Sequence, residues 1–286
     1  MIGRTLRRIS TLTCLAGLAI GTLADDRPAQ TPVRSGEFWI LAGDFHVHAF
    51  PGDGSLTPSD LRGEALRAGL DVIAITNHNQ IATGRFGEWI ASRTDGPILI
   101  GGEEITNPDY HLIAVGVRRL VRADQGAVEA IDAIHAQGAV AIAAHPTPSF
   151  RGWDDLALAL VDGTEVAHPS DRFEEKSEFV NTFKRARRLN PHVAPIGSSD
   201  IHVTPTLGSC RTFVFARERS ITGALEAIRA GRTVAADESG TLYGNPDLIA
   251  RVQSANLPGR AHTRDAWRRL SLFLTWVALA AVLLFG

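Results

Sequence analysis

The chain has 286 residues, with 29 basic and 31 acidic side chains, 44% hydrophobic residues, ten histidines and two cysteines. A formal net charge of -2 argues against a nucleic-acid partner, which needs clustered cationic contacts to phosphate, and the apolar content excludes wholesale disorder. The two cysteines are far apart in sequence, and Cys14 lies in the N-terminal apolar run, so no disulfide is expected within the folded part.

Residues 1–24 predict a secretory signal peptide. A basic start precedes an apolar stretch from Ile9 to Leu23, and the small residue Ala24 stands before two aspartates. The alternative is an uncleaved N-terminal anchor. We therefore expect an exported protein, in the periplasm or on the outer face of the cell membrane.

Residues 25–37 predict a linker, and the main domain is expected over residues 38–245. In this domain short β-branched runs alternate with amphipathic segments, which is typical of an α/β protein. Helices are predicted between most of the strands, for example from the cap residue Thr57 to Gly69. The predicted strands are Trp39–His46, Asp71–Thr76, Ile98–Ile105, His111–Val117, Ala139–Ala144, Gly163–Ala167, Val193–Gly197 and Thr212–Ala216.

The C-terminal part predicts a second linker over residues 246–266 and a transmembrane anchor over residues 267–286. From Leu270 onward the sequence is apolar apart from Ser271 and Thr275, and a tryptophan and two arginines precede it. The alternative is a terminal helix buried against the domain. If the domain is exported, the two arginines lie on the outer side, against the usual cytoplasmic bias of positive charge.

Nine histidine and carboxylate side chains lie close to the ends of predicted strands. In a parallel barrel the carboxyl ends of all strands open on one face, so these residues would converge there. Imidazole and carboxylate groups bind divalent metal ions, and a carboxylate can bridge two of them. The alternative for any single histidine is a hydrogen-bonded structural role. The candidate ligands are His46, His48, Asp53, His78, Glu104, His111, His145, Asp200 and His202.

The motifs that hold these residues resemble, in order, those of the PHP family (polymerase and histidinol phosphatase). They are Gly43–Pro58, Val72–Asn79, Gly102–Thr106, Tyr110–Gly116, Ala144–Pro146 and Gly197–His202, within residues 40–236. The resemblance implies a distorted seven-stranded, TIM-like (β/α) barrel with two to three divalent ions, of Zn, Mn or Fe.

The resemblance also implies which residues hold each ion. One ion would be held by His46, His48, Glu104 and Asp200, a second by Glu104, His111 and His145, and a third by Asp53, His78 and His202. Glu104 fits the pattern of glycine, any residue, Glu, Ile, Thr, whereas the neighbouring Glu103 is the alternative, because adjacent strand residues face opposite sides.

One position departs from the family pattern. Asn77 stands where many phosphatase-like members carry Asp, which removes a possible acceptor or proton relay behind the ligands without removing a ligand. With Arg211-Thr212 and the segment Glu226–Arg232, this variant is more similar to the branch that contains the CehA and McbA metallohydrolases. That branch includes hydrolysis of carbamate and amide bonds as well as phosphate esters.

The expected chemistry is hydrolysis by a hydroxide formed from water on the metal centre, where the pKa of water falls to about 7. Asp200 would orient this water and relay its proton, and His168, at the end of a predicted strand, is a candidate general acid. Arg211 and Arg232 are candidates for a cationic clamp on the substrate, with solvent exposure as the alternative. The other histidines, His135, His192 and His262, are assigned to structure or solvent.

Four functions follow from this sequence. The first is hydrolysis of a small-molecule phosphoester, and the second is hydrolysis of a non-phosphate ester, carbamate or amide. The third is a non-catalytic, metal-dependent binding domain at the membrane. The fourth is an exonuclease, which the near-neutral charge disfavours. The oligomeric state is left open.

Overall fold

The computed structural model describes residues 2–25, 32–169, 173–203, 206–257, 270–271, 273–278 and 280–281. The chain divides into two units. One unit is Gln30–Ala255, and the other combines Met1–Ala29 with Asn256–Gly286.

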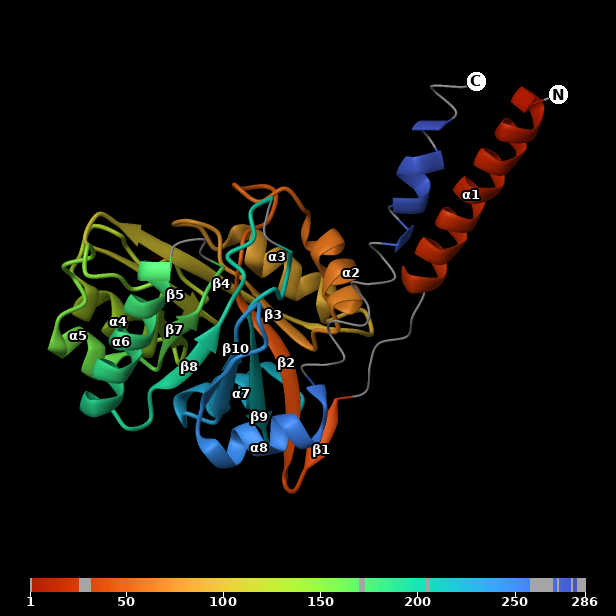
Figure 1. The fold of residues 1–286 in the computed structure, drawn as a ribbon. Coiled ribbons are helices and arrows are strands. Elements are labelled where there is room, and N and C mark those ends of the chain that lie inside the picture. Colours follow the sequence, from red (N-terminus) through yellow and green to blue (C-terminus); the bar gives the residue numbers. More distant parts are fainter. Residues whose placement is uncertain are drawn as a thin grey trace. The chain divides into compact units, whose positions relative to one another are not determined.

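The unit Gln30–Ala255 contains a mixed sheet and most of the helices (Figure 1). Its strands are β1 (Val33–Ser35), β2 (Phe38–Val47), β3 (Val72–Ile75), β4 (Ile98–Asn107), β5 (Tyr110–Val115), β6 (Val140–Ala143), β7 (Gly163–Ala167), β8 (Ala194–Gly197), β9 (Arg211–Ala216), β10 (Thr233–Ala236) and β11 (Leu242–Gly244). Its helices are α2 (Pro58–Ala68), α3 (Ala82–Ala91), α4 (Ala127–His135), α5 (Asp155–Leu160), α6 (Phe173–Leu189), α7 (Ile221–Arg229) and α8 (Pro246–Ser254).

The strands form an α/β, barrel-like sheet that is nearly closed. Their order is β11-β10-β9-β2-β3-β4-β5-β6-β7-β8, with β1 paired to β2. Two buried threonines connect β8 to the other arm of the sheet: Thr212 Oγ1 lies 2.9 Å from both the amide nitrogen and the carbonyl oxygen of Gly197, and Thr233 Oγ1 donates to Pro195 O at 2.9 Å. Side-chain bonds therefore replace part of the missing strand pairing.

The predicted α/β, barrel-like fold is confirmed, but the distorted seven-stranded (β/α) barrel needs correction in detail, because the described sheet has eleven strands and mixed directions. β5 is antiparallel to both β4 and β6, and β9 is antiparallel to β2. The reason at β5 is the connection: only Pro108 and Asp109 separate β4 from β5, whereas a parallel pair needs a crossover of about a dozen residues. The start of β5 therefore lies beside the end of β4.

Both predicted linkers also need correction, because each contains regular structure. β1 lies within residues 25–37, and α8 occupies the first nine residues of the predicted linker 246–266. Asn245 caps α8 by accepting a hydrogen bond from the Asp247 amide, and Val252 of this helix is fully buried. A short edge strand and a polar helix that begins at a proline resemble loops in sequence.

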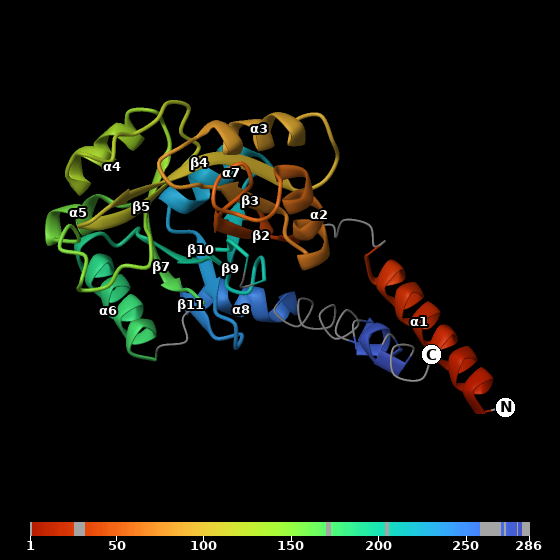
Figure 2. The same cartoon turned by 90° about the horizontal axis from the view of Figure 1, so that it is seen from above.

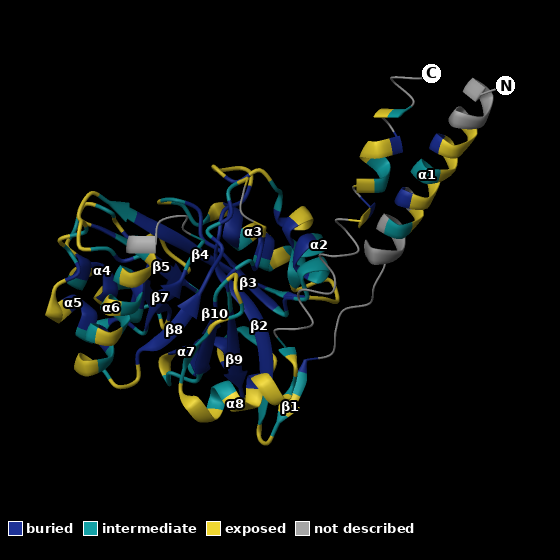
Figure 3. Ribbon diagram, viewed as in Figure 1, coloured by how far each residue is buried: buried dark blue, intermediate teal, exposed yellow. Residues whose placement is uncertain are grey.

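The helices α2 to α6 lie around the outside of the sheet, and the strands are largely buried (Figures 2 and 3). α2 begins as predicted: Thr57 and Asp60 form a reciprocal capping box, and Gly69 ends the helix with a left-handed φ of 69°. Along β5, Ile113 and Val115 face one apolar cluster and the intervening side chains face another. The alternation fixes which polar residues can point toward the inside of the barrel.

In the terminal unit, α1 (Ile2–Asp25) covers the segment predicted as a signal peptide. Ser271 Oγ donates to Gly17 O at 2.7 Å, so described residues from the two ends of the chain are in contact. Among the described residues, no helix is both long and apolar enough to cross a membrane. Half of the residues of the predicted anchor at 267–286 lie outside the described residues, and both this anchor and the signal peptide stay predictions.

An ion pair far from the candidate ligands gives a first testable prediction. His135 on α4 contacts Asp162, before β7, at 2.9 Å, and this bond raises the pKa of His135 above its ordinary value. The bond therefore stabilises the fold fully below about pH 6.5, and the contribution disappears as the pH rises through the folded-state pKa. Because His135 is one-third exposed, we expect His135→Gln to cost about 1 kcal/mol at pH 6 and less at pH 8.5.

Urea unfolding of the metal-free protein at the two pH values would measure this difference. His192→Gln, in an exposed position before β8, is the matched control and should show no such dependence. An equal cost of His135→Gln at both pH values would contradict the assignment.

Candidate metal centre

The structure brings all nine predicted ligands together in three overlapping groups. Their members follow β2, β3, β6 and β8 or lie near the β4–β5 turn, so the reversed direction of β5 keeps His111 at the same end as Glu104. The groups are His46, His48, Glu104 and Asp200; Glu104, His111 and His145; and His48, Asp53, His78 and His202. The third group includes His48, which the sequence had placed only in the first.

The first group is the most buried. His46 Nε2 lies 3.2 Å from both Glu104 Oε2 and Asp200 Oδ1, and His48 Nε2 lies 3.3 and 3.1 Å from the same two oxygens. The two imidazoles have no exposed side-chain surface. A register shift of β2 against β3 between Asp44 and Val47 accompanies this placement, and such irregularities re-aim side chains near sites.

Glu104 belongs to two groups through its two oxygens. In addition to its contacts with His46 and His48 in the first group, Oε2 lies 2.8 Å from His78 Nδ1. The other oxygen, Oε1, lies 2.8 Å from His111 Nδ1 and 3.4 Å from His145 Nε2. This carboxylate is therefore placed to bridge two cations, as the resemblance implied for Glu104.

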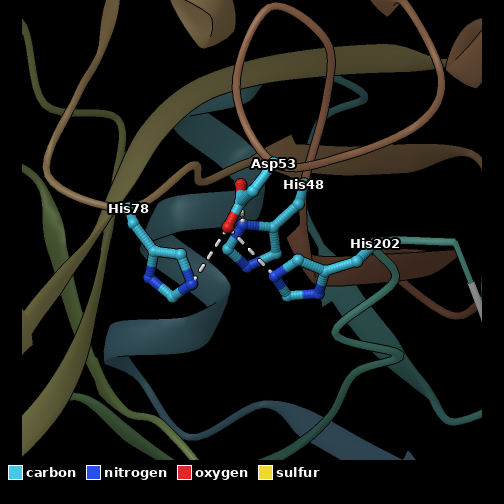
Figure 4. Close-up of side chains that lie close together, drawn as sticks. All are labelled: His48, Asp53, His78 and His202. Carbon is cyan, nitrogen blue, oxygen red and sulfur yellow. Dashed lines mark hydrogen bonds and ion pairs between the residues drawn. The ribbon is translucent and has the colours of Figure 1, made fainter.

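The third group is built around Asp53 in the loop after β2 (Figure 4). Asp53 Oδ1 lies 3.0 Å from His48 Nδ1, and Oδ2 lies 3.2 Å from His78 Nε2 and 3.1 Å from His202 Nε2. The side chains of Asp53, His78 and His202 are 34–40% exposed. An ion here would exchange with solvent more readily than one in the first group.

The first group fits a metal ion on two grounds. Within the described structure, His46 Nε2, His48 Nε2 and Asp200 Oδ1 are buried without a hydrogen-bond partner, although they lie 3.1–3.3 Å from one another or from Glu104. A tetrahedral ion with bonds of about 2.0–2.1 Å holds its ligand atoms about 3.3 Å apart. Buried polar atoms that converge without hydrogen bonds are what a bound cation requires.

The negative charge of the Glu104 and Asp200 carboxylates is the second ground for a bound cation. Burial by itself lowers the pKa of His46, but the Asp200 and Glu104 carboxylates outweigh it and raise that pKa well above its ordinary value. For His48, burial likewise lowers the pKa, and the proximity of the same two carboxylates raises it to about 9. Without a metal, the carboxylates thus draw protons onto the histidines. A divalent ion would replace those protons.

Two ligands have left-handed backbone, which is uncommon away from glycine: φ is 28° at His145 and 49° at Asp200. Buried Asp44 supports the loop that carries Asp200. Its Oδ1 accepts from the Ser199 amide at 3.0 Å, and its Oδ2 accepts from the Gly208 amide at 2.9 Å. Strained backbone held by a buried carboxylate is typical of a functional site.

Of the two neighbouring glutamates, Glu104 faces the metal centre and Glu103 faces the outer side of β4. Glu103 Oε1 accepts from the Val121 amide at 2.7 Å, and its Oε2 is buried without a hydrogen-bond partner among the described residues. Burial raises the pKa of Glu103 to about 7. The strand alternation therefore selects Glu104, as the motif predicted.

Asn77 fixes the loop that follows β2. Its Oδ1 accepts from the Ala49 amide at 2.9 Å, and its Nδ2 donates to Ala49 O at 2.7 Å and to Pro51 O at 3.2 Å. An aspartate could not donate these last two bonds. The family's carboxylate at this position is thus replaced by a group that supports the loop leading to Asp53.

His168 lies at the metal centre, as expected of a candidate general acid. Its Nε2 is 3.4 Å from Asp200 Oδ2, and its Nδ1 is buried without a hydrogen-bond partner in the described structure. The ring contacts those of His145 and Phe179 at centroid distances of 5.3 and 5.7 Å.

The two candidate clamp arginines have other partners. Arg211 donates to the backbone oxygens of Gly208 and Ala68, which ties a loop to the end of α2. Arg232 pairs with Glu226 and lies over the ring of Phe38, the first residue of β2, whereas the ligands follow the end of that strand. The printed contacts of both arginines are therefore with the protein itself, and their role as a substrate clamp stays a prediction.

Three residues near the ligands were not predicted. Glu165 on β7 contacts His46 and the backbone of His145, Asp44 holds the Asp200 loop, and Phe150 lies against His111 and His145 with centroid distances of 4.9 and 6.0 Å. The sequence signals available were weak, namely a carboxylate two residues before His46 and another three residues before His168. Of the remaining histidines, His135 and His192 lie elsewhere, and His262 lies outside the described residues.

Comparison with known proteins supports the assignment. A family model described as PHP-associated matches residues 184–233. The chain is 30% identical over 133 residues to the uncharacterized protein MJ1587 of Methanocaldococcus jannaschii, covering 46% of this chain and 72% of that protein. It is 26% identical, with a TM-score of 0.63, to a two-domain Bacteroides vulgatus protein containing a predicted PHP-like metal-dependent phosphoesterase, covering 78% of this chain and 72% of that one. With the nearly closed sheet and the ordered motifs, these findings show that the chain belongs to the PHP family.

Proposed function

We propose that this protein is a metal-dependent hydrolase that acts on small-molecule phosphoesters. The observation that carries the proposal is the convergence of nine ligand residues in three overlapping groups, two of which share Glu104. Buried nitrogen and oxygen atoms of this cluster have no hydrogen-bond partner among the described residues. The Bacteroides vulgatus relative, which contains a predicted metal-dependent phosphoesterase, supports the choice of phosphoesters. Two to three divalent ions, of Zn, Mn or Fe, would supply Lewis acidity and lower the pKa of a water at the centre.

The chain's own residues supply the proton transfers. Asp200 places Oδ1 in the first group and Oδ2 toward His168, at 3.4 Å. Asp200 is therefore the group that orients the attacking water and accepts its proton. His168, largely buried beside it, is the group that returns a proton to the leaving oxygen.

One feature favours a second candidate, the hydrolysis of an aryl ester, carbamate or amide. Within the described residues, the cationic side chains that pair with Asp53, Glu104 and Asp200 are all histidines. Phe150 and Phe179 instead place aromatic surface beside the histidines. The resemblance of the Asn77 variant to the CehA and McbA branch also supports this second candidate.

A substrate panel separates the two candidates. The full-length chain, purified in mild detergent and loaded separately with Mn²⁺, Zn²⁺ or Fe²⁺, is assayed on p-nitrophenyl phosphate, bis(p-nitrophenyl) phosphate, p-nitrophenyl acetate and phenyl N-methylcarbamate. We expect metal-dependent turnover with the phosphate esters preferred, and loss of turnover in Asp200→Asn loaded with the same metal. Preference for the acetate or carbamate would establish the second candidate. No turnover by a metal-loaded protein would favour a binding domain.

We propose in addition that the enzyme is exported and acts in the periplasm or at the outer face of the cell membrane, held there by the C-terminal segment 267–286. The N-terminal basic and apolar pattern and the apolar C-terminal sequence support this location. We expect no nucleic-acid partner, given the near-neutral charge. Cell fractionation with protease protection of the intact cells tests the location.

A further inference from the structure

A carboxylate on β7, Glu165, contacts residues from two of the metal-binding groups. The side chain is fully buried. Its Oε1 lies 3.1 Å from His46 Nδ1, and its Oε2 accepts a hydrogen bond of 2.6 Å from the His145 backbone amide. Each of the two carboxylate oxygens therefore has one N–H group as its partner.

The bond to His46 determines which ring nitrogen can bind a metal. A carboxylate at Nδ1 keeps the proton on that nitrogen, because only a donor can satisfy it. The lone pair then lies on Nε2, which points at Glu104 and Asp200 at 3.2 Å. A carboxylate behind a metal-binding imidazole also increases its basicity, and loss of such a partner typically weakens metal binding about 10- to 100-fold.

The bond to His145 fixes backbone rather than a ring. His145 has a φ of 28°, which side-chain-bearing residues rarely adopt, and its amide donates directly to Glu165. This backbone directs Nε2 of His145 toward Glu104 Oε1, at 3.4 Å. Without the carboxylate, the strained turn loses the bond that offsets its cost.

We propose that Glu165 is a positioning residue that sets the affinity of two metal positions together, the one built on His46 and the one built on His145. The third position, built on Asp53, His78 and His202, receives no contact from Glu165 among the described residues and keeps its affinity. This inference rests on the metal-binding part of the proposed function, but not on the substrate.

The informative substitution is Glu165→Gln, which preserves size. An amide can accept only through its oxygen, so one of the two N–H groups must face another donor. If the oxygen faces His46, the NH₂ opposes the His145 amide; if it faces His145, the NH₂ opposes His46 Nδ1. One position is thus disturbed directly in either orientation, and the loss of negative charge weakens the other.

The same strand offers a matched control. Asp162, directly before β7, also holds a histidine ring and a backbone amide: its Oδ2 lies 2.9 Å from His135 Nε2 and 2.8 Å from the Ala141 amide. This pair lies at the other end of β7, away from the ligands. Asp162→Asn therefore repeats the chemical change without touching a metal position.

The test measures Zn²⁺ binding to the full-length, metal-stripped protein by competition with a chelating dye. We expect two of the three positions in Glu165→Gln to bind Zn²⁺ about 10-fold or more weakly than in wild type, with the third unchanged. Asp162→Asn should bind like wild type, although its unfolding midpoint falls. Zn²⁺ affinities of Glu165→Gln within twofold of wild type, or an equal loss in Asp162→Asn, would overturn the proposal.

A second measurement remains decisive if Glu165→Gln does not fold. Nitrogen-15 NMR of the Zn²⁺-loaded wild type should show His46 with a proton on Nδ1 and the metal on Nε2, and the reverse assignment would overturn the proposal. Failure here is separable from failure of the proposed function. If Glu165→Gln weakens Zn²⁺ binding but the wild type hydrolyses no phosphoester, only the proposed function is refuted. If the wild type hydrolyses phosphoesters but Glu165→Gln leaves the Zn²⁺ affinities unchanged, only this inference is refuted.

Discussion

Glu104→Gln is expected to lower kcat/KM for the preferred substrate by about 1,000-fold or more, equivalent to roughly 4 kcal/mol of transition-state stabilisation. The reason is that both oxygens of Glu104 are used. Oε2 faces His46, His48 and His78, and Oε1 faces His111 and His145. An amide offers one oxygen and one NH₂, so it cannot bridge two cations, and its nitrogen would point into one group of ligands.

The adjacent residue provides the control for this substitution. Glu103 has the same side chain on the same strand but faces away from the metal centre, toward the Val121 amide. Glu103→Gln keeps an oxygen for that amide and removes a carboxyl whose buried Oε2 has no hydrogen-bond partner among the described residues. We expect its metal content and turnover to match those of wild type.

Metal analysis by mass spectrometry and steady-state kinetics on the two variants give the comparison. Glu104→Gln should lose at least one metal ion per chain relative to Glu103→Gln, with the circular dichroism of both unchanged. If Glu104→Gln retained full metal content and at least a tenth of the wild-type kcat/KM, the bridging role of Glu104 would be refuted.

The ligands could be predicted from sequence because the chemistry of strand ends is local. His46 is the last but one residue of β2 and His48 follows that strand directly, while His145 and Asp200 lie in the loops just after β6 and β8. The predicted strand boundaries therefore already place these ligands at one end of the sheet. A one-residue error at a strand end changes the face of a side chain but not the end at which it lies. The same reading found β7 to the residue and most other strands within two residues.

The position of Arg232 could not be predicted, because it depends on strand direction. Arg232 precedes β10, which pairs antiparallel to β9, and β9 is itself antiparallel to β2. Trp39 at the start of β2 faces Ala216 at the end of β9, so Arg232 lies near the start of β2. Periodicity shows where a strand is but does not show which way it runs in the sheet.

Glu165 was missed for a different reason. It lies inside a short strand rather than at its end. Its contribution to metal binding depends on its contact with His46, which is 119 positions away in sequence. Asp44 likewise acts on Ser199 and Gly208, far along the chain. Supporting carboxylates of this kind are defined by three-dimensional contacts, and only the ligands themselves leave a motif.

Removal of metal ions is expected to lower the midpoint of thermal unfolding by about 10 °C at pH 8. An ion that binds only the folded chain, at a free concentration about 1,000 times its dissociation constant, stabilises the fold by about 4 kcal/mol. For a domain of this size each kcal/mol corresponds to about 2–4 °C. The measurement is calorimetry on the Zn²⁺-loaded protein and on the same protein after chelation and dialysis.

The gap between the two midpoints should widen as the pH rises. In the metal-free protein, burial lowers the pKa of His48, but the nearby carboxylates of Asp200 and Glu104 outweigh it and raise that pKa to about 9. The pKa of His46 is raised in the same way. A histidine whose pKa is raised on folding stabilises the fold fully below about pH 6.5 and loses this contribution as the pH approaches 9. Zn²⁺ must displace those protons, so its affinity rises over the same interval. We therefore expect the gap to be at least twice as large at pH 8.5 as at pH 6, and a gap that narrows with rising pH would show that the histidines are not the groups that Zn²⁺ deprotonates.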